Sequence, residues 1–479
     1  MNFLGSNKIG KIEIDELPIT FSPENIFERI QREPFSFFLD SGTDKDKLGR
    51  YSFMGYRPFL ILRSKGEEIV IIKGKESYHK TGNPFMILDE ISKTYKIKTD
   101  LTLLPFFGGG VGYLSYDLCH FVEKLPRSVD DDLNLPDCYF CFYDTLLGYD
   151  HQKEKWYLCR SDFGERDDRP TKESIIELLG QNEYGLSRER ADNDSSQSIS
   201  FGKNKQAIKL KSNFSKKDYL RAINKAKQYI YAGDIYQVNL SQRFHTKINV
   251  TPYQLYKKLR KINPAPFACY LNFQDLAIVS SSPERFLKVV GDKVQTRPIK
   301  GTRPRGKNKI DDKKFREELL ASEKDHAELN MIVDLERNDL GRVCDYGTVE
   351  VTEHATLETY ATVFHLVSTI EGRLLSKYNN IDLIRACFPG GSITGAPKIR
   401  SMEIIDELEP TARNIYTGSV GYLGFNDNID LNIAIRTIVV KDDDAYFQVG
   451  GGIVADSHPE EEYKETLDKA RALIESFNS

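Results

Sequence analysis

Residues 294–306 read V-Q-T-R-P-I-K-G-T-R-P-R-G, and they place a single lysine, Lys300, among three arginines. These arginines are Arg297, Arg303 and Arg305. An amine surrounded by cations is expected to have a lowered pKa, and the neutral amine is the form that attacks an electrophile. The same composition is also typical of a solvated basic turn. Whether Lys300 is a nucleophile or part of a solvated turn depends on the residues elsewhere in the chain.

Length and charge exclude several classes of protein. A chain of 479 residues is too long for one simple core, which favours two or three domains or one large two-lobed unit. The formal net charge of -4 provides no basic field for nucleic acid. The chain has no secretory signal pattern at its start and no apolar run of roughly 18 residues. We therefore expect a cytoplasmic protein that binds neither nucleic acid nor a membrane.

The cysteines and histidines do not form a metal-binding pattern. The seven cysteines are scattered, and Cys138 and Cys141 form a lone C-x-x-C in a strand-like run. The eight histidines include no H-x-x-x-H spacing. We interpret the cysteines as small core residues rather than zinc ligands or a redox pair.

Strand-like segments dominate the first 160 residues. The glycine-rich run 108–117 matches neither phosphate-loop pattern, so we interpret it as a strand that another backbone approaches closely. Residues 166–211 are polar and charged, with one short helix predicted near 172–179. We predict an N-terminal region at 1–165, a linker at 166–211 and a catalytic domain at 212–479.

The C-terminal half carries polar residues at unusual places. Residues 235–244 alternate as a strand that turns Gln237 toward a polar cavity or solvent, away from an apolar side that includes Tyr236. A helix predicted over 323–337 aligns Glu328 with an apolar stripe, which requires a positive partner. Glu284 lies at a turn between two strands, and residues 430–440 read as one strand.

Two glycine-rich segments and the last helix complete this half. The loop 388–400 leads into a helix and suits an anion, although an ordinary turn explains it equally well. The glycines of 449–456 interrupt a strand, which indicates that a ligand or another backbone lies close. On the last helix Glu462, Glu465 and Lys469 share one face. The alternative for that face is a solvated surface stabilised by the Glu465–Lys469 pair.

These residues suggest a chemistry when they are taken together. Two glutamates on separate helices, without histidine or thiolate ligands, suit Mg²⁺. Such a metal keeps positions free for an anionic substrate, and the cations and glycine loops provide further anion contacts. The residues alone thus indicate an enzyme that acts on a small polycarboxylate with Mg²⁺, a lysine and an acid.

A family resemblance makes this interpretation more specific. In chain order, the motifs are S-P-E-R-F (282–286), P-I-K-G-T (298–302), A-E-L-N-M-I-V-D-L-E-R-N-D-L-G-R (327–342), H-L-V-S-T-I (365–370), P-G-G-S-I-T-G-A-P-K (389–398), M-E-I-I-D-E-L-E-P (402–410), G-G-G-I-V-A-D-S (450–457) and E-x-x-E-T-x-x-K (462–469). Together they closely resemble the chorismate-binding family, which includes anthranilate, aminodeoxychorismate, isochorismate and salicylate synthases. The match covers about residues 213–479. The N-terminal half resembles the family more weakly, through the segments 38–42 and 49–53. It implies an α+β, two-lobed fold in which large antiparallel sheets form a sandwich with helices outside.

Two positions favour one branch of that family. Gln237 stands where isochorismate and salicylate synthases carry a lysine base, and Lys300 stands where anthranilate synthases typically carry alanine. The resemblance thus implies conversion of chorismate and ammonia to 4-amino-4-deoxychorismate, the precursor of 4-aminobenzoate and folate. The alternatives are an anthranilate synthase component I of tryptophan biosynthesis and a non-catalytic subunit that senses an aromatic metabolite.

The resemblance also implies a role for each site residue. Lys300 is expected to attack chorismate covalently, and Glu284 to protonate the departing hydroxyl. Glu328 and Glu465, with Glu462 close by, are expected to hold Mg²⁺. The implied substrate-binding residues are Gly301, Thr302, His365, Thr394, Lys398, Tyr416, Arg436, Gly450, Gly451 and Gly452. A pocket for L-tryptophan is implied at Ser41, Leu48, Gly49, Arg50, Tyr51, Pro266, Phe267 and Ala268.

The source of ammonia is expected to be a partner protein. The chain has no cysteine in a G-x-C-x-G nucleophile context, so we expect it to contain no glutaminase domain. A separate glutamine amidotransferase subunit, component II, is the implied partner. Elimination of pyruvate to form 4-aminobenzoate is expected to need another enzyme.

Overall fold

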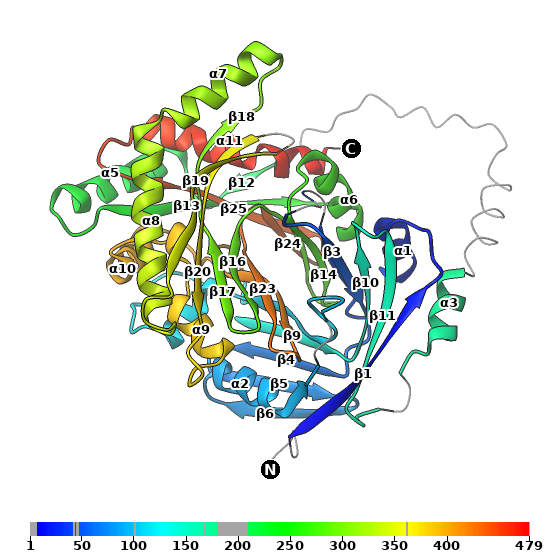
Figure 1. Ribbon diagram of the computed structural model, residues 1–479. Coiled ribbons are helices and arrows are strands. Elements are labelled where there is room, and N and C mark those ends of the chain that lie inside the picture. The colour runs from blue at the N-terminus through cyan, green and yellow to red at the C-terminus, as the bar shows by residue number, and fades with distance from the viewer. Residues whose placement is uncertain are drawn as a thin grey trace.

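The computed structural model describes residues 7–41, 44, 47–99, 102–166, 169–180, 209–360 and 363–478. Two large sheets face each other in it, with helices around them (Figure 1). Most of the predicted linker 166–211 lies outside the described residues, and its described part contains α3 (Lys172–Gly180), as predicted. No helix in these ranges is long and apolar enough to cross a membrane.

The first sheet joins strands from both ends of the chain. All its pairings are antiparallel except that of β1 with β7. Its order is β12 (Lys211–Ser212), β13 (Gln237–Lys247), β25 (Asp444–Ile453), β24 (Thr437–Lys441), β15 (Ala277–Ser282), β14 (Phe267–Asn272), β2 (Phe37–Asp40), β3 (Tyr51–Gly55), β10 (Thr145–Asp150), β11 (Lys155–Asp162), β1 (Lys8–Leu17) and β7 (Tyr95–Ile97), and β21 (Gly395–Ala396) pairs with β13.

The second sheet is antiparallel and is also built from both halves. Its order is β18 (Ile299–Pro304), β20 (Val363–Arg373), β17 (Lys293–Arg297), β16 (Arg285–Val290), β23 (Ile429–Ile433), β22 (Ser419–Gly424), β8 (Gly109–Leu114), β9 (Cys138–Tyr143), β4 (Leu60–Lys65), β5 (Glu68–Lys73) and β6 (Glu76–Thr81), and β19 (Glu350–Thr359) pairs with β20. The two halves of the chain meet where β14 pairs with β2 and where β22 pairs with β8. Both halves of the chain therefore contribute strands to each sheet. The predicted division into regions at 1–165 and 212–479 stays a prediction.

The glycine-rich run near residue 110 forms β8, which confirms the predicted strand. Gly112 is paired with Gly421 on one side and Phe140 on the other. A Cβ atom on Gly112 would collide with the carbonyl oxygen of Tyr139, so the close approach of two backbones explains the glycine.

The core has an inner layer between the sheets and outer layers under the helices. The inner layer is rich in aromatic side chains, such as Phe53, Tyr113 and Tyr422. The helices outside are α1 (Pro23–Ile30), α2 (Pro84–Thr94), α5 (Lys216–Tyr231), α6 (Pro252–Ile262), α7 (Lys309–Leu320), α8 (Glu323–Gly341), α9 (Asn380–Cys387), α10 (Lys398–Leu408) and α11 (Pro459–Phe477). This arrangement confirms the predicted α+β sandwich with helices outside (Figure 1).

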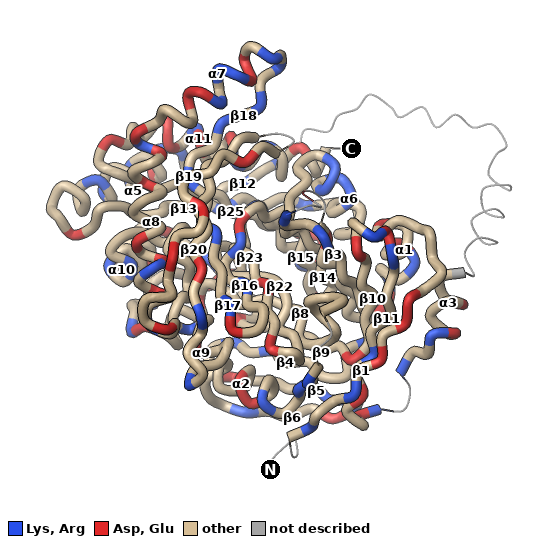
Figure 2. Tube along the Cα trace, viewed as in Figure 1, with Lys and Arg blue, Asp and Glu red and all other residues tan. Residues whose placement is uncertain are grey.

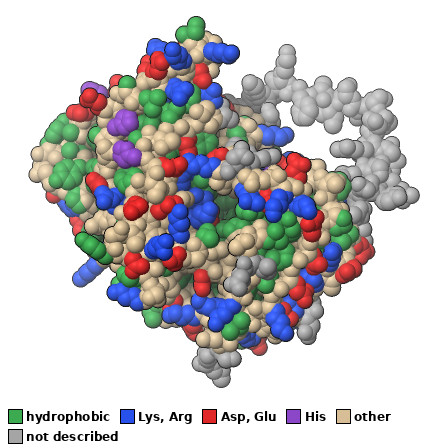
Figure 3. Space-filling model, viewed as in Figure 1, with side chains coloured by type: hydrophobic (Ala, Val, Ile, Leu, Met, Phe, Trp, Pro, Cys, Tyr) green, Lys and Arg blue, Asp and Glu red, His purple; other side chains and the backbone are tan. Residues whose placement is uncertain are grey.

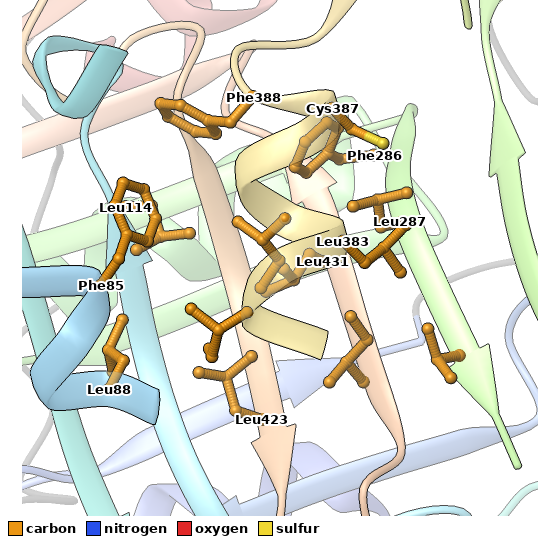
Figure 4. Packing of buried hydrophobic residues seen from close by; sticks show 14 of the residues in the cluster. Phe85, Leu88, Leu114, Phe286, Leu287, Leu383, Cys387, Phe388, Leu423 and Leu431 are labelled. Atoms are coloured by element: carbon orange, nitrogen blue, oxygen red, sulfur yellow. The ribbon is translucent and has the colours of Figure 1, made fainter. Parts of the chain in front are cut away.

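Helices α2 and α9 hold one strand of the active centre in place. Figure 4 shows Phe85 and Leu88 of α2 packed with side chains of the second sheet and with Phe388, which follows α9. Phe388 also contacts Phe286 of β16, with ring centroids 6.0 Å apart. Burying each of these side chains stabilises the fold by about 2 kcal/mol. The packing fixes β16 directly after Glu284.

Three local predictions were wrong. Residues 430–440 are not one strand, because the chain leaves the second sheet after Ile433 and enters the first sheet at Thr437. Helix α8 continues past 337 to Gly341. Tyr236 lies just before β13 with 73% of its surface exposed, so it does not join the apolar side of that strand.

Candidate active site

Lys300 of β18 forms an ion pair with Glu328 of α8. Lys300 Nζ lies 2.8 Å from Glu328 Oε1, and the two side chains are only 11% and 16% exposed. Gln237 donates from Nε2 to the same oxygen at 2.5 Å, so it does face a polar interior, as predicted. Burial lowers the pKa of Lys300, but the Glu328 carboxylate more than offsets this and the net pKa is raised.

The three arginines near Lys300 do not depress its pKa, which corrects the sequence-based expectation. Each is neutralised by an acid from elsewhere in the fold. Basic and acidic segments accordingly lie side by side around β18, β19 and β20 (Figure 2). The pairs are Arg297 with Glu358 at 2.6 Å, Arg303 with Asp325 at 2.9 Å and Arg305 with Asp312 at 2.7 Å.

Glu284 lies between β15 and β16 and is only 4% exposed. Burial raises its pKa, and the Ser392 hydroxyl and the Lys300 ammonium partly offset this effect. The N–H of Ile299, the residue before Lys300, points at Glu284 Oε1 over 3.5 Å. A buried carboxyl group with a raised pKa that lies near an amine is suited to general acid chemistry.

The acids of α11 face the same region from the other sheet. Glu465 forms an ion pair with Lys469 at 2.6 Å, which lowers the pKa of Glu465. Burial raises the pKa of Glu462, and Ser457 donates a hydrogen bond to its Oε1 at 2.7 Å. Lys469 also donates to the carbonyl oxygen of Gly450 at 2.9 Å.

Two glycines of β25 leave room for these acids. A Cβ atom on Gly451 would lie 3.4 Å from both Glu462 Oε2 and Glu465 Oε1. One on Gly452 would lie 2.9 Å from Glu328 Oε1 and would collide with Gln237 Nε2. The three predicted metal ligands therefore border the same strand, at positions where no side chain intervenes.

Carboxylate oxygens are the donors that Mg²⁺ prefers, so the chemistry of this set fits that metal. In the described ranges, however, no three His, Cys, Asp or Glu side chains lie close enough to hold a metal ion as they stand. Glu328 and Glu465 are each paired with a lysine instead.

The predicted substrate residues of β18 and β20 lie together. Thr302 and His365 are paired in register, and Thr302 Oγ1 lies 2.8 Å from His365 Nδ1. Burial and the charge of Arg436 lower the pKa of His365 to about 4, so this imidazole is neutral at physiological pH. Gly301 has φ +71°, and Cβ there would crowd Leu319 and Asp325 of the neighbouring helices.

Arg436 reaches the helix that carries the acids. Its guanidinium donates to the carbonyl oxygen of Lys469, and burial lowers its pKa. Tyr416 is buried close to Arg413, whose guanidinium lies 5.7 Å from the Tyr416 ring centroid. Burial raises the pKa of the Tyr416 hydroxyl. Burial thus disfavours the charged form of each side chain, which is the guanidinium of Arg436 and the phenolate of Tyr416.

Thr394 and Lys398 have protein partners. Thr394 donates to the carbonyl oxygen of Gly390 at 3.0 Å. Lys398 forms an ion pair with Asp339 of α8 and donates to the carbonyl oxygen of Cys387 at 3.2 Å. A substrate that binds the Thr394 hydroxyl or the Lys398 ammonium group would have to replace these protein partners.

The comparisons with known proteins agree with the motifs. A family model described as chorismate binding enzyme matches residues 30–475. The chain belongs to the chorismate-binding enzyme family. It is 40% identical to anthranilate synthase component 1 of Acetivibrio thermocellus, over 95% of this chain and 92% of that protein. It is 41% identical to aminodeoxychorismate synthase component 1 of Bacillus subtilis (strain 168), over 89% of this chain and 88% of that protein.

The fold of this chorismate-binding enzyme is that of anthranilate synthase component I. The crystal structure of that protein from Streptococcus pneumoniae TIGR4 is similar with a TM-score of 0.75 and 30% identity, covering 96% of this chain and 99% of the other. This chain is therefore a chorismate-utilising enzyme of the anthranilate and aminodeoxychorismate synthase family. Relatives of both names are about equally similar to it, so identity alone does not select the product.

A separate cavity of about 330 Å³ lies between the two sheets of this chorismate-binding enzyme. The face in Figure 3 is hollowed near its middle, with Lys and Arg side chains on both sides of the hollow. Gly49 of the predicted tryptophan pocket is not part of the cavity lining, and its N–H donates to the carbonyl oxygen of Asp44. The other predicted residues line the cavity: Ser41, Leu48, Arg50, Tyr51, Pro266, Phe267 and Ala268.

Lys288 of β16 lines this cavity and was missed by the sequence reasoning. Both acids of the cavity wall are neutralised, Asp40 by Arg260 and Asp430 by Arg285. The side chain of Lys288 has no ion pair or hydrogen bond to any described residue; burial lowers its pKa, and the Asp430 carboxylate partly offsets this effect. The sequence signal was weak, because Lys288 sits in the otherwise apolar run F-L-K-V-V.

Glu336 of α8 is a second residue that the motifs did not single out. It is 8% exposed and accepts a hydrogen bond from Thr296 Oγ1 at 2.9 Å. Burial and the charge of Glu284 raise its pKa to about 8. Its signal was the i+4 spacing of Glu328, Ile332 and Glu336, which puts two acids on one helical stripe.

The Lys300–Glu328 pair predicts a stability effect that is independent of function. Lys300→Met leaves the Glu328 carboxylate without its cation and is expected to lower the free energy of unfolding by about 2 kcal/mol. Adding Glu328→Gln to that variant is expected to restore most of the loss, because no buried charge remains. Urea unfolding in the presence of EDTA measures the free energy of unfolding of the single and the double variant. Equal stability of the two variants would show that the Lys300–Glu328 ion pair does not contribute as expected.

Proposed function

We propose that this protein is component I of an aminodeoxychorismate synthase, which converts chorismate and ammonia to 4-amino-4-deoxychorismate. The observation that carries the proposal is the buried Lys300 amine, which lies between one carboxylate and one carboxyl group. Glu328 pairs with the amine at 2.8 Å, and the Glu284 carboxyl lies at the N–H of the preceding residue. A nucleophile and a proton donor thus meet at one place.

Lys300 must be neutral when it attacks. Its pKa is raised only by its carboxylate neighbours, chiefly Glu328. Burial acts in the opposite direction, so the amine becomes neutral readily once Glu328 is drawn into another interaction. The ion pair therefore represents a resting state, and substrate binding is the event expected to change it.

The proposed reaction has two displacements. The neutral Lys300 amine forms a bond to C2 of chorismate while the C4–oxygen bond breaks, and Glu284 gives its proton to the departing hydroxyl, which leaves as water. Ammonia then forms a bond to C4 while the lysine–C2 bond breaks, which returns Lys300 as the neutral amine. The new ammonium group passes its extra proton to the Glu284 carboxylate.

We place Mg²⁺ at Glu328 and Glu465, with Glu462 close by. Bound there, Mg²⁺ would supply positive charge to neutralise a chorismate carboxylate and would draw Glu328 away from Lys300. The chain's own residues provide the remaining contacts. Arg436 supplies a cation for a carboxylate, and the neutral His365–Thr302 pair and Tyr416 supply hydrogen-bonding groups. Thr394, Lys398 and the backbone of Gly301 and Gly450 to Gly452 are proposed to complete the substrate site.

We also propose that ammonia comes from a separate glutamine amidotransferase subunit. The relatives at about 40% identity are named as component 1 of their enzymes, which supports a second component here. The second candidate function is anthranilate synthase component I, which is favoured by the names of several relatives.

The product formed with chorismate, Mg²⁺ and an ammonium salt distinguishes the two candidates. We expect aminodeoxychorismate by mass spectrometry, and Lys300→Ala is expected to reduce its formation by about 10²-fold or more because the covalent route is lost. Lys313→Ala, on the exposed face of α7, serves as the control and is expected to behave as wild type. Anthranilate as the main product would favour the second candidate, and no turnover of chorismate would refute both.

The cavity between the sheets is proposed to bind L-tryptophan. Its wall offers aromatic and apolar contacts for the indole, such as Phe53, Leu48 and Tyr422. Lys288 offers the ligand carboxylate a cation without an ion-pair partner among the described residues, whereas Lys47 and Arg50 of the same wall are paired with acids. This arrangement favours an aromatic amino acid over a neutral arene.

Lys288→Met tests that assignment. The variant is expected to bind tryptophan at least about tenfold more weakly, because the carboxylate loses its cation. Tryptamine, which has no carboxylate, is expected to bind both proteins equally. Lys293→Met, on the neighbouring strand β17 and outside the cavity lining, is the control. Isothermal titration calorimetry measures the affinity of the wild type and of both variants for each ligand. Unchanged tryptophan affinity in Lys288→Met would contradict the role of Lys288.

A further inference from the structure

Arg413 and Glu409 form an ion pair in the interior of the protein. The two side chains are only 1% and 2% exposed. Arg413 donates from Nε to Glu409 Oε2 at 2.9 Å and from Nη2 to Glu409 Oε1 at 2.7 Å. Glu409 belongs to the motif M-E-I-I-D-E-L-E-P at 402–410. Burying two charges is costly, yet the proposed reaction gives neither of them a role.

Arg413 uses all five of its N–H groups. Two of them bind Glu409, and Nη2 also donates to the carbonyl oxygen of Asn239 at 2.7 Å. Nη1 donates to the carbonyl oxygen of Ile393 at 3.0 Å and to Thr417 Oγ1 at 3.3 Å. Among side chains, only a guanidinium group offers five donors in a rigid plane. A lysine at this position would donate at most three hydrogen bonds, all from one atom.

The acceptors of Arg413 lie next to residues of the active centre. Ile393 precedes Thr394, and Thr417 follows Tyr416. The acceptor in β13 lies two residues after Gln237. One guanidinium group thus joins three segments that each carry a residue of the candidate active site.

The turn that carries Tyr416 has an unfavourable backbone. Asn414 and Thr417 have φ of +51° and +60°, a region that is rarely adopted by β-branched residues such as threonine. Thr417 Oγ1 accepts from Arg413 and donates to the carbonyl oxygen of Tyr416 at 2.6 Å. The N–H of Tyr416 donates to the carbonyl oxygen of Arg413 at 3.1 Å. Arg413 therefore contacts this turn through its backbone as well as through its side chain.

Tyr416 has a hydroxyl that no protein group occupies. The side chain is 8% exposed, and its hydroxyl has no hydrogen-bond partner among the described residues. The N–H of Thr417 donates to the carbonyl oxygen of Ala434 at 3.0 Å, which ties the turn to the segment that leads to Arg436. A largely buried donor without a protein partner is available to a ligand.

We propose that Arg413 is a positioning residue that holds the Tyr416 hydroxyl toward chorismate. The proposal rests on the assignment of Tyr416 as a substrate-binding residue in the function proposed above. Glu409 keeps the guanidinium group in place, since Glu409 Oε1 also accepts from the N–H of Ser241 at 2.8 Å and from its hydroxyl at 2.7 Å. The buried pair is thus anchored to β13 on one side and supports the turn of Tyr416 on the other.

Arg413→Lys tests this role in a double-mutant cycle with Tyr416→Phe, because lysine keeps the charge and loses the planar set of donors. kcat/KM for chorismate consumption is measured with Mg²⁺ and an ammonium salt. We expect each single variant to lower it by about tenfold. In Tyr416→Phe, we expect Arg413→Lys to have less than about a twofold further effect, because the hydroxyl that it positions is already absent.

Arg243→Lys is the matched control. Arg243 is only 7% exposed and forms an ion pair with Asp132 at 2.5 Å, but it contacts none of the proposed substrate residues. We expect this variant to stay within about twofold of the wild type in both backgrounds.

Equal losses from Arg413→Lys in the wild type and in Tyr416→Phe would show that Arg413 supports the fold rather than the hydroxyl, and would overturn the proposal. Wild-type activity in either single variant would also overturn it. Chorismate consumption is followed whichever amino product forms, so a wrong product assignment does not affect the result. No consumption by the wild type would refute the proposed function, and the role of Arg413 with it.

Thr417 provides a smaller change that tests the same link even if Arg413→Lys fails to fold. Thr417→Val removes the hydroxyl that joins the guanidinium group to the carbonyl oxygen of Tyr416, whereas Thr417→Ser keeps it. We expect Thr417→Val to lower kcat/KM by about threefold or more, and Thr417→Ser to remain near the wild type. Equal effects of the two substitutions, or a loss in Thr417→Val that persists in Tyr416→Phe, would overturn the proposal.

Discussion

The active centre depends on two places where the chain crosses from one sheet to the other. At residues 283–284 the chain leaves β15 for β16, and at 434–436 it leaves β23 for β24. The crossings are tied together, since Ser281 N donates to Arg436 O at 3.1 Å and Ile433 N donates to Glu284 O at 3.0 Å. The backbone hydrogen bonds of each crossing thus fix Glu284, the proposed general acid, and Arg436, a proposed substrate-binding residue, relative to each other.

The charges of the centre are balanced internally before any substrate arrives. Lys300 pairs with Glu328, Lys469 with Glu465 and Lys398 with Asp339. A buried ion is costly without a partner, so each pair keeps its members in place at little net gain in stability. In the proposed function, a dicarboxylate substrate and a divalent cation exchange with these partners, so binding redistributes existing pairs rather than burying new charge.

The motifs predict residues that the structure brings close together, but they did not predict the electrostatics around them. Most strands and the polar orientation of Gln237 follow from local patterns, which the sequence reports directly. The neutralisation of Arg297 by Glu358 and the change of sheet after Ile433 depend on contacts between distant segments, which local periodicity does not encode. Glu336 was overlooked because its i+4 spacing from Ile332 does not by itself show that the side chain is buried, and its partner Thr296 lies 40 residues away.

The central claim is that Lys300 forms a covalent bond to chorismate. The most direct measurement is intact-protein mass spectrometry of the chain incubated with chorismate and Mg²⁺ in the absence of ammonia, followed by peptide mapping. We expect an adduct with the mass of chorismate less one water, located on Lys300 and released by added ammonium. No adduct, or an adduct that persists in Lys300→Ala, would contradict it.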